Sequence, residues 1–100
     1  MQVNIVKTEK LTTIKLQGRF DFNTHRDFRA AAEPVLQEEP KQIEVDLGGV
    51  DYLDSSALGM LLMLRDKTQA VNKTLALVNC RGSVRQVLDI ANFGKLFSIS

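Results

Sequence analysis

The chain has 100 residues, 44% of them hydrophobic, and its 13 basic and 12 acidic side chains give a net charge of +1. This length and composition suit a single compact domain, and the near-neutral charge argues against a nucleic-acid or anionic-membrane partner. The longest apolar run, residues 60–64, is too short to span a membrane, and the N-terminus lacks the layout of a signal peptide. We therefore expect a cytoplasmic protein.

The N-terminal stretch up to Phe20 predicts a β-hairpin. Apolar residues alternate with polar ones in two runs, at Val3 and Ile5 and at Ile14 and Leu16. This period of two is typical of strands that bury one face. The two strands would be antiparallel and joined near Glu9 and Lys10. Asp21 then opens a loop that leads to a helix.

The first helix is signalled by Asn23 or Thr24 as the N-cap, with Asp27 completing an arrangement close to a capping box. Its apolar face repeats with helical spacing, at Phe28, Ala31, Ala32, Val35 and Leu36. Pro34 lies inside this pattern and removes a backbone donor, which predicts a kink or an irregular turn over residues 30–34. Pro40 ends the helical stretch.

A strand, a helix and a second strand follow. Ile43, Val45 and Leu47 alternate with polar residues, and this alternation is lost after Gly48-Gly49. A helix is predicted from about residue 55 or 56 to residue 72, and the strand 75–78 comes next. Such a unit predicts parallel strands with a right-handed connection, and together with the hairpin it predicts a mixed sheet.

The start of the second helix carries the most informative polar residues. Asp54 and Ser55 are both good N-caps, so Ser56 should lie in the first turn. The backbone N–H groups there have no partner within the helix and the helix dipole is positive, which would stabilise a phosphoryl group on the Ser56 hydroxyl. By spacing alone, an ordinary capping sequence without a regulatory role explains the same residues.

Two methionines in the second helix allow two interpretations. Five large apolar residues in a row, at positions 60–64, cannot all share one face of a helix. We place Met60 and Met63 toward the rim of the domain. They either fill the core or form an adaptable surface where a partner docks.

The C-terminal segment predicts one more helix and a short ending. Ser83 and Gln86 form a capping-box pattern, and Asn92 and Gly94 can end the helix. The predicted helical face contains Val84, Val87, Leu88 and Ala91, and Phe93, Leu96 and Phe97 should pack back onto the domain. Residues 98–100 would form a short terminal strand or a frayed tail.

Catalytic chemistry is hard to assemble from these residues. Cys80 is the only cysteine and His25 the only histidine, and they lie in distant segments, so a half-buried, inert Cys80 is favoured over a nucleophile. No nucleotide-binding, hydrolase or metal-binding motif is present. Glu38 and Glu39 suit a solvated surface, whereas Asp51 with Asp54 would repel a phosphate rather than cleave one. We expect neither an enzyme nor a cofactor or metal site.

Nearly the whole chain resembles the STAS domains of bacterial anti-sigma factor antagonists. The central motif is Asp54-Ser55-Ser56-Ala57-Leu58-Gly59, which follows Val45-Asp46-Leu47 and Val50-Asp51-Tyr52-Leu53. The turn Gly18-Arg19-Phe20-Asp21 and the ending Asn92-Phe93-Gly94-Lys95-Leu96-Phe97 also match the pattern of this family. Two departures are Ala57, where many relatives have glycine, and Gly94, one place later than usual. Alanine should firm the helix start and narrow the approach of a kinase.

The resemblance implies a single α/β domain over residues 1–100, with a mixed sheet of about four to five strands and helices packed mainly on one face. It implies binding to an anti-sigma factor, which is often a serine kinase, so that a sigma factor is released. Phosphorylation of Ser56 would switch binding off, and a serine phosphatase would restore it. The expected partner-binding residues are Asp21, Asp54, Ser55, Ser56, Ala57, Met60 and Met63. A monomer is expected.

Two other functions stay open at this point. The first is a STAS scaffold or transporter-associated subunit that is never phosphorylated and uses the same helix face. The second is a sensor of a small ligand or nucleotide, which would use Gly48-Gly49 and the helix N-terminus as an anion site.

Overall fold

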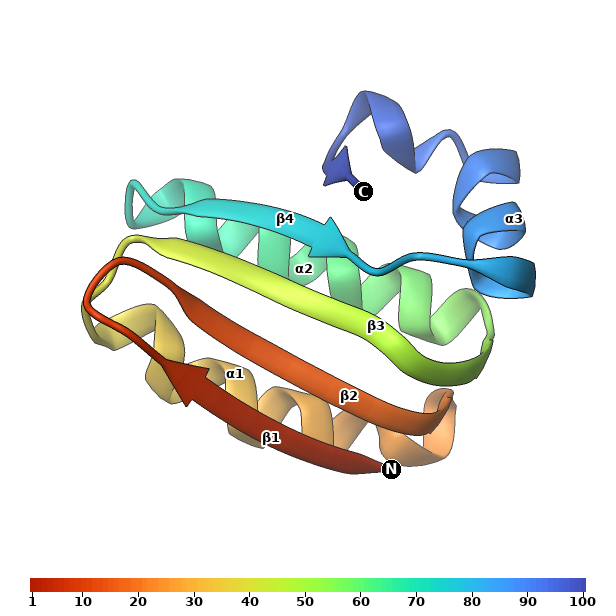
Figure 1. The fold of residues 1–100 in the computed structure, drawn as a ribbon, viewed down its shortest axis with the longest axis horizontal. Helices are drawn as coiled ribbons and strands as arrows, with labels where there is room; N and C mark the ends of the chain where they lie inside the picture. Colours follow the sequence, from red (N-terminus) through yellow and green to blue (C-terminus); the bar gives the residue numbers. More distant parts are fainter.

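The computed structural model describes residues 1–100 and contains five strands and three α-helices (Figure 1). In chain order these are β1 (Gln2–Lys7), β2 (Thr12–Phe20), α1 (His25–Gln37), β3 (Gln42–Leu53), α2 (Ser55–Ala70), β4 (Thr74–Val78), α3 (Gly82–Ile90) and β5 (Ser98–Ile99). Two short 3-10 helices, η1 (Phe22–Thr24) and η2 (Phe93–Lys95), precede α1 and β5. None of the helices combines the length and the apolar character that crossing a membrane requires.

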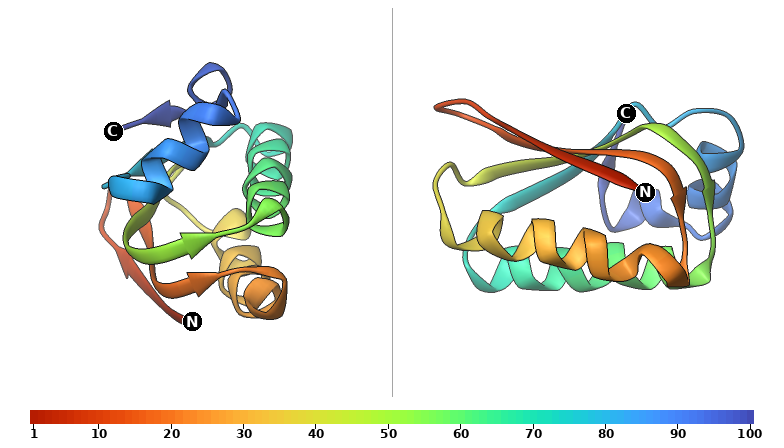
Figure 2. Two further views of the ribbon diagram at one scale, coloured as in Figure 1. Left: turned by 90° about the vertical axis from the view of Figure 1, so that its right-hand side faces the viewer. Right: turned by 90° about the horizontal axis from the view of Figure 1, so that it is seen from below.

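The strands form one mixed sheet in the order β1-β2-β3-β4-β5. β1 is antiparallel to β2, and the remaining neighbours are parallel. α1 and α2 lie side by side against one face of the sheet, and α3 lies beyond the carboxyl end of β4 (Figure 2). The predicted α/β class, hairpin and parallel strand–helix–strand unit are therefore confirmed.

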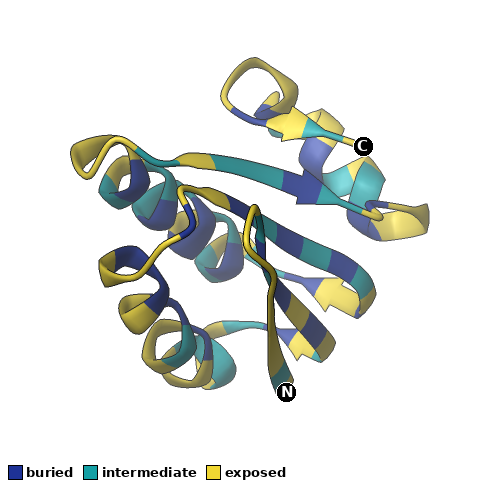
Figure 3. Ribbon diagram, turned by 60° about the vertical axis from the view of Figure 1, so that its left-hand side comes forward, coloured by how far each residue is buried: buried dark blue, intermediate teal, exposed yellow.

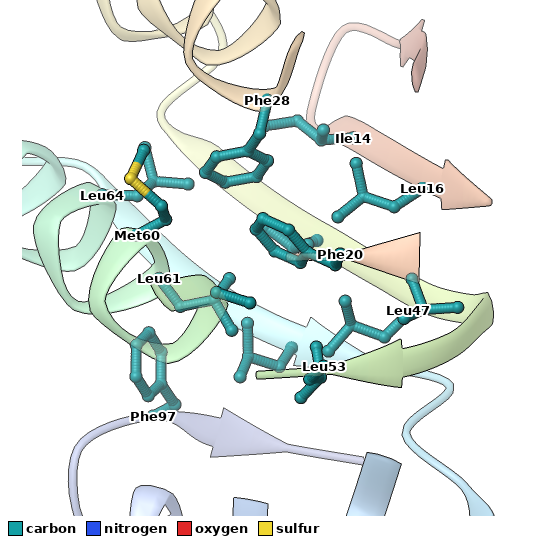
Figure 4. Close-up of a cluster of buried hydrophobic side chains, with 14 of the residues drawn as sticks. Ile14, Leu16, Phe20, Phe28, Leu47, Leu53, Met60, Leu61, Leu64 and Phe97 are labelled. Carbon is teal, nitrogen blue, oxygen red and sulfur yellow. The ribbon is translucent and has the colours of Figure 1, made fainter. Parts of the chain in front are cut away.

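Strand pairing explains how the alternating pattern builds the core. Val3 lies opposite Leu16 and Ile5 opposite Ile14, so the apolar side chains of the hairpin share one face. Buried positions alternate with exposed ones along β2 and β3 (Figure 3). The rings of Phe20 and Phe28, on β2 and α1, have centroids 4.9 Å apart inside the core (Figure 4). Burial of each such side chain contributes roughly 1.5–3 kcal/mol.

The third strand is longer than the sequence pattern predicts, because β3 continues through Gly48 and Gly49 to Leu53. The register between β2 and β3 shifts at this point, so that Gln17 pairs with Gly49. A Cβ atom at Gly49 would lie 2.9 Å from the Leu16 carbonyl oxygen, so the strands approach this closely only because glycine is present. Gly48-Gly49 thus form part of an irregular strand, in which the predicted alternation is lost although the strand itself continues.

The predicted start of α1 is confirmed at Thr24, but the predicted capping interaction is wrong. Thr24 precedes the helix but makes no side-chain capping bond to it, so no Thr24–Asp27 capping box forms. Asp21 instead caps η1, in a reciprocal capping box with Thr24. The helix also continues through Pro34 to Gln37 without the irregular turn that we predicted.

The C-terminal predictions are confirmed in part. Val84 and Leu88 of α3 are buried, as are Phe93 and Phe97, and β5 forms the short terminal strand. Asn92 ends the helical segment with a left-handed backbone (φ 60°). The Ser83–Gln86 capping box is wrong, because α3 already begins at Gly82 and Arg81 makes no side-chain cap. Leu96 is exposed rather than packed.

Two buried threonines provide a test of the packing. Thr12 and Thr68 are both almost fully buried, but the Thr12 hydroxyl has no hydrogen-bond partner, whereas that of Thr68 donates to the Arg65 carbonyl (2.7 Å). Valine has the same shape, so we expect Thr12→Val to raise the free energy of unfolding by about 1 kcal/mol. Thr68→Val, the matched control, should not stabilise the protein. Urea denaturation measures both, and a lower midpoint for Thr12→Val would contradict this account of the core.

Candidate functional site

The candidate site forms where the carboxyl ends of β2 and β3 meet. The two strands are parallel, and Phe20 pairs with Leu53 at their last positions. The residues that follow each strand therefore lie at the same edge of the sheet. This register brings Asp21 and η1 next to Asp54 and the first turn of α2, although the two segments are far apart in the sequence.

Asp54 connects these two segments through its carboxylate. Oδ1 accepts a hydrogen bond from the Ala57 N–H (3.0 Å), which caps α2. Oδ2 accepts a hydrogen bond from the Phe22 N–H in η1 (3.3 Å). The Asp54 N–H in turn donates to the Phe20 carbonyl at the end of β2 (3.4 Å). The predicted role of Asp54 at the helix start is thus confirmed, and it also fixes the neighbouring turn.

Asp21 shapes the other half of the site. Its carboxylate accepts a hydrogen bond from the Asn23 N–H (2.9 Å), and its own N–H donates to the Thr24 hydroxyl (2.9 Å). The Asp21 carboxylate also pairs with the Arg19 guanidinium (3.4 Å). Asp21 therefore holds η1 against the end of β2, and its charge is partly offset by Arg19.

Ser56 lies in the first turn of α2, as predicted. Its side chain is partly exposed, and its hydroxyl makes no hydrogen bond within the chain, while Ser55 is exposed. The N–H groups of a first turn lack acceptors within the helix, so the local field favours an anion. The arrangement is that of an accessible hydroxyl on the positive end of a rigid helix.

Two of the expected partner-contacting side chains are not at the surface. Ala57 is fully buried, so only its backbone takes part in the site. Met60 has an exposed fraction of 9% and lies among core side chains near Phe28 (Figure 4), so its placement at the rim is wrong. It points into the contact between α1 and α2, where a flexible thioether fills irregular space. Met63 is partly exposed, so it lies nearer the rim than Met60.

Two aromatic residues at the site were missed by the sequence analysis. Phe22 in η1 has an exposed fraction of 66%, and Tyr52 near the end of β3 one of 42%. The Arg19 guanidinium lies over the Tyr52 ring, 4.1 Å from its centroid. The sequence held one indication that Phe22 is exposed, because Phe22 follows the capping residue Asp21 and lies outside the alternating pattern that buries Phe20.

Cys80 and His25, the two residues considered for nucleophilic chemistry, do not form a catalytic pair. Cys80 is buried, more deeply than predicted, and burial raises the pKa of its thiol despite the opposing effect of Arg85. A protonated thiol is a poor nucleophile. His25 Nδ1 lies 2.5 Å from the Phe22 carbonyl oxygen, to which it can donate. His25 therefore takes part in the η1 turn.

The bridging role of Asp54 can be tested by truncation. We expect Asp54→Ala to lower the free energy of unfolding by about 1–2 kcal/mol, because α2 loses its cap and η1 loses its anchor. Asp51→Ala is the matched control, since Asp51 is an exposed carboxylate of the same segment without a hydrogen bond within the chain. Urea denaturation of both variants measures the difference. Equal midpoints would contradict the bridging role.

Comparisons with known proteins agree with this architecture. A family model described as "Mlab, STAS domain" matches residues 3–98. The chain is 53% identical over 88 residues to a STAS-domain containing protein of Pseudomonas aeruginosa, an alignment that covers 88% of this chain and 86% of that protein. It is 24% identical to the anti-sigma-B factor antagonist of Staphylococcus aureus, over all of this chain and 94% of the relative.

Solved structures of the Bacillus anti-sigma factor antagonist SpoIIAA have a similar fold. The unphosphorylated form superposes with a TM-score of 0.76 at 22% identity and covers 99% of this chain and 87% of its own. The phosphorylated form superposes with a TM-score of 0.75 at 21% identity, with coverages of 99% and 91%. At this level of identity the likeness concerns the fold.

Proposed function

The chain belongs to the STAS-domain family, and from this premise we propose that it is an anti-sigma factor antagonist that phosphorylation of Ser56 switches off. The observation that carries the proposal is the state of the Ser56 hydroxyl. It is partly exposed, makes no hydrogen bond within the chain and lies in the first turn of α2, which Asp54 ties to η1.

Electrostatics supply a mechanism for the switch. A phosphoryl group adds about −1.5 to −2 charge at neutral pH. The positive end of α2 tolerates this charge, so the fold would change little. Asp21 and Asp54 already make the surface acidic, with Arg19 as the cation paired to Asp21. A partner that docks on Ser56 would then meet a bulky group and excess negative charge, and would dissociate.

The relatives support this proposal by their descriptions. The Staphylococcus aureus relative is named an anti-sigma-B factor antagonist, and SpoIIAA is known in an unphosphorylated and a phosphorylated form. By analogy, the partner of this chain is an anti-sigma factor that is itself a serine kinase, and a serine phosphatase restores binding. The protein acts in the cytoplasm as a monomer and without catalysis of its own. Its docking surface contains Asp21, Asp54, Ser55, Ser56 and Met63.

Substitution of Ser56 tests the switch. We expect Ser56→Ala to co-purify from its own cells with an anti-sigma factor that mass spectrometry identifies. Ser56→Asp should lose that protein, because a permanent negative charge occupies the docking surface. Both variants should keep the urea midpoint of the wild-type protein to within about 1 kcal/mol, because the first turn of a helix tolerates either residue.

Ser83→Asp is the matched control, since Ser83 is an exposed serine in the first turn of α3. It should bind like the wild-type protein. Retention of the anti-sigma factor by Ser56→Asp would contradict the switch. If Ser56→Ala and Ser56→Asp instead bind a scaffold or membrane-associated complex equally well, the result would favour the unphosphorylated scaffold.

A further inference from the structure

We propose that Phe22 and Tyr52 form the apolar anchor of the docking surface, and that the anti-sigma factor receives them in an apolar cleft bordered by basic side chains. This inference rests on the proposed function and adds the residues that supply affinity and the chemistry that the partner needs. We refer to Phe22 and Tyr52 together as the aromatic pair.

Phe22 is exposed to solvent, although Phe20, its near neighbour in the sequence, is buried in the core. Phe20, two positions earlier, is fully buried and packs against Phe28, whereas Phe22 has an exposed fraction of 66%. Single exposed apolar residues are common in proteins. Here, however, the exposed ring belongs to the turn that Asp54 ties to the first turn of α2, so Phe22 and Ser56 are parts of one surface.

The backbone around Phe22 is held in place from both sides. Asp21 and Thr24 close a capping box around η1, and the Phe22 N–H donates to Asp54. The Phe22 carbonyl oxygen lies 2.5 Å from His25 Nδ1, and the rings of Phe22 and His25 have centroids 5.2 Å apart. A side chain presented on such a fixed turn loses little conformational entropy when a partner binds, which favours affinity.

Tyr52 is oriented by a second set of contacts. Arg19 and Tyr52 pair across β2 and β3, and the guanidinium lies 4.1 Å from the ring centroid. The same guanidinium contacts the Asp21 carboxylate, which caps η1. Arg19 thus connects the Tyr52 ring to the turn that carries Phe22. Exposed aromatic side chains in fixed positions are typical of the residues that dominate binding energy at protein interfaces.

The charges around the aromatic pair indicate the chemistry of the occupant. Asp21, Asp51 and Asp54 lie in the segments that carry the two rings, and Arg19 is already paired with Asp21 and stacked on Tyr52. An acidic rim around an apolar centre complements a cleft lined by apolar side chains with lysine or arginine at its border. Against a partner with such a basic border, phosphate on Ser56 would interrupt binding chiefly by its bulk, because it would fill the space that the partner needs.

The experiment measures the affinity of the purified anti-sigma factor recovered with Ser56→Ala for four forms of this chain. Phe22→Ala and Tyr52→Ala should each weaken binding at least tenfold relative to the wild-type protein. Val71→Ala is the matched control, because Val71 is exposed to 42% at the opposite end of α2, about 22 Å from Ser56 along the helix. It should bind within twofold of the wild-type protein. Urea midpoints of all four forms verify that each one is folded.

A second readout does not depend on side-chain truncation. A photo-crosslinking amino acid placed at position 22 should form an adduct with the anti-sigma factor, whereas the same group at position 71 should not. The adduct at position 22 should disappear when Ser56→Asp is introduced. Tyr52→Ala could disturb the end of β3 and so weaken binding indirectly. A photo-crosslinking amino acid with an aromatic ring at position 52 avoids this problem and tests Tyr52 in the same way.

The outcomes separate the inference from the proposed function. If Ser56→Asp loses the anti-sigma factor but Phe22→Ala and Tyr52→Ala bind within twofold of the wild-type protein, the anchor is wrong and the proposed function stands. If no form of the chain binds an anti-sigma factor, both are wrong. Sedimentation of the chain alone as a dimer that Phe22→Ala dissociates would show that a second copy covers the aromatic pair, and would also overturn the inference.

Discussion

The carboxylate of Asp54 accepts one hydrogen bond from the start of α2 and another from η1, two segments that follow different strands of the sheet. Parallel pairing of β2 and β3 brings these segments together, but strand pairing alone leaves the direction of the turn and of the helix free. Asp54 removes that freedom. The positions of Ser56 and Phe22 relative to each other therefore depend on the Asp54 carboxylate, together with the capping box that Asp21 and Thr24 close around η1, so the turn and the helix start are fixed to each other.

Rigidity of this kind suits a switch that works by local charge. Ser56, the proposed phosphate acceptor, is partly exposed in the first turn, whereas Ala57 and Met60 on the other side of α2 belong to the core. A new charge on Ser56 meets the unpaired N–H groups of the helix start, so it does not strain the packing beneath it. The fold can thus remain constant while the surface changes its complementarity to a partner. A two-state rearrangement of the domain is not needed for regulation.

The sequence was sufficient for the alternation in β2, the cap at Asp54 and the first-turn position of Ser56, because these features depend on local period and capping chemistry. It was insufficient where tertiary contacts decide. β3 passes through Gly48-Gly49 since β2 approaches closely there, and Met60 is buried because α1 lies against α2. The capping role of Asp21 was missed because η1 precedes α1, so that the cap belongs to a turn without helical periodicity. Phe22 and Tyr52 were missed because a pattern of apolar residues does not show which aromatic side chains remain exposed to solvent.

The central claim is that Ser56 is a regulated phosphate acceptor, and its most direct test is the intact mass and the phosphosite map of the protein purified from its own cells during growth and under stress. Our account predicts one phosphate, on Ser56, in a fraction of the molecules that changes with the condition. An unmodified Ser56 in every condition, with the protein held in a stable complex, would contradict the account and favour an unphosphorylated scaffold built on the same surface.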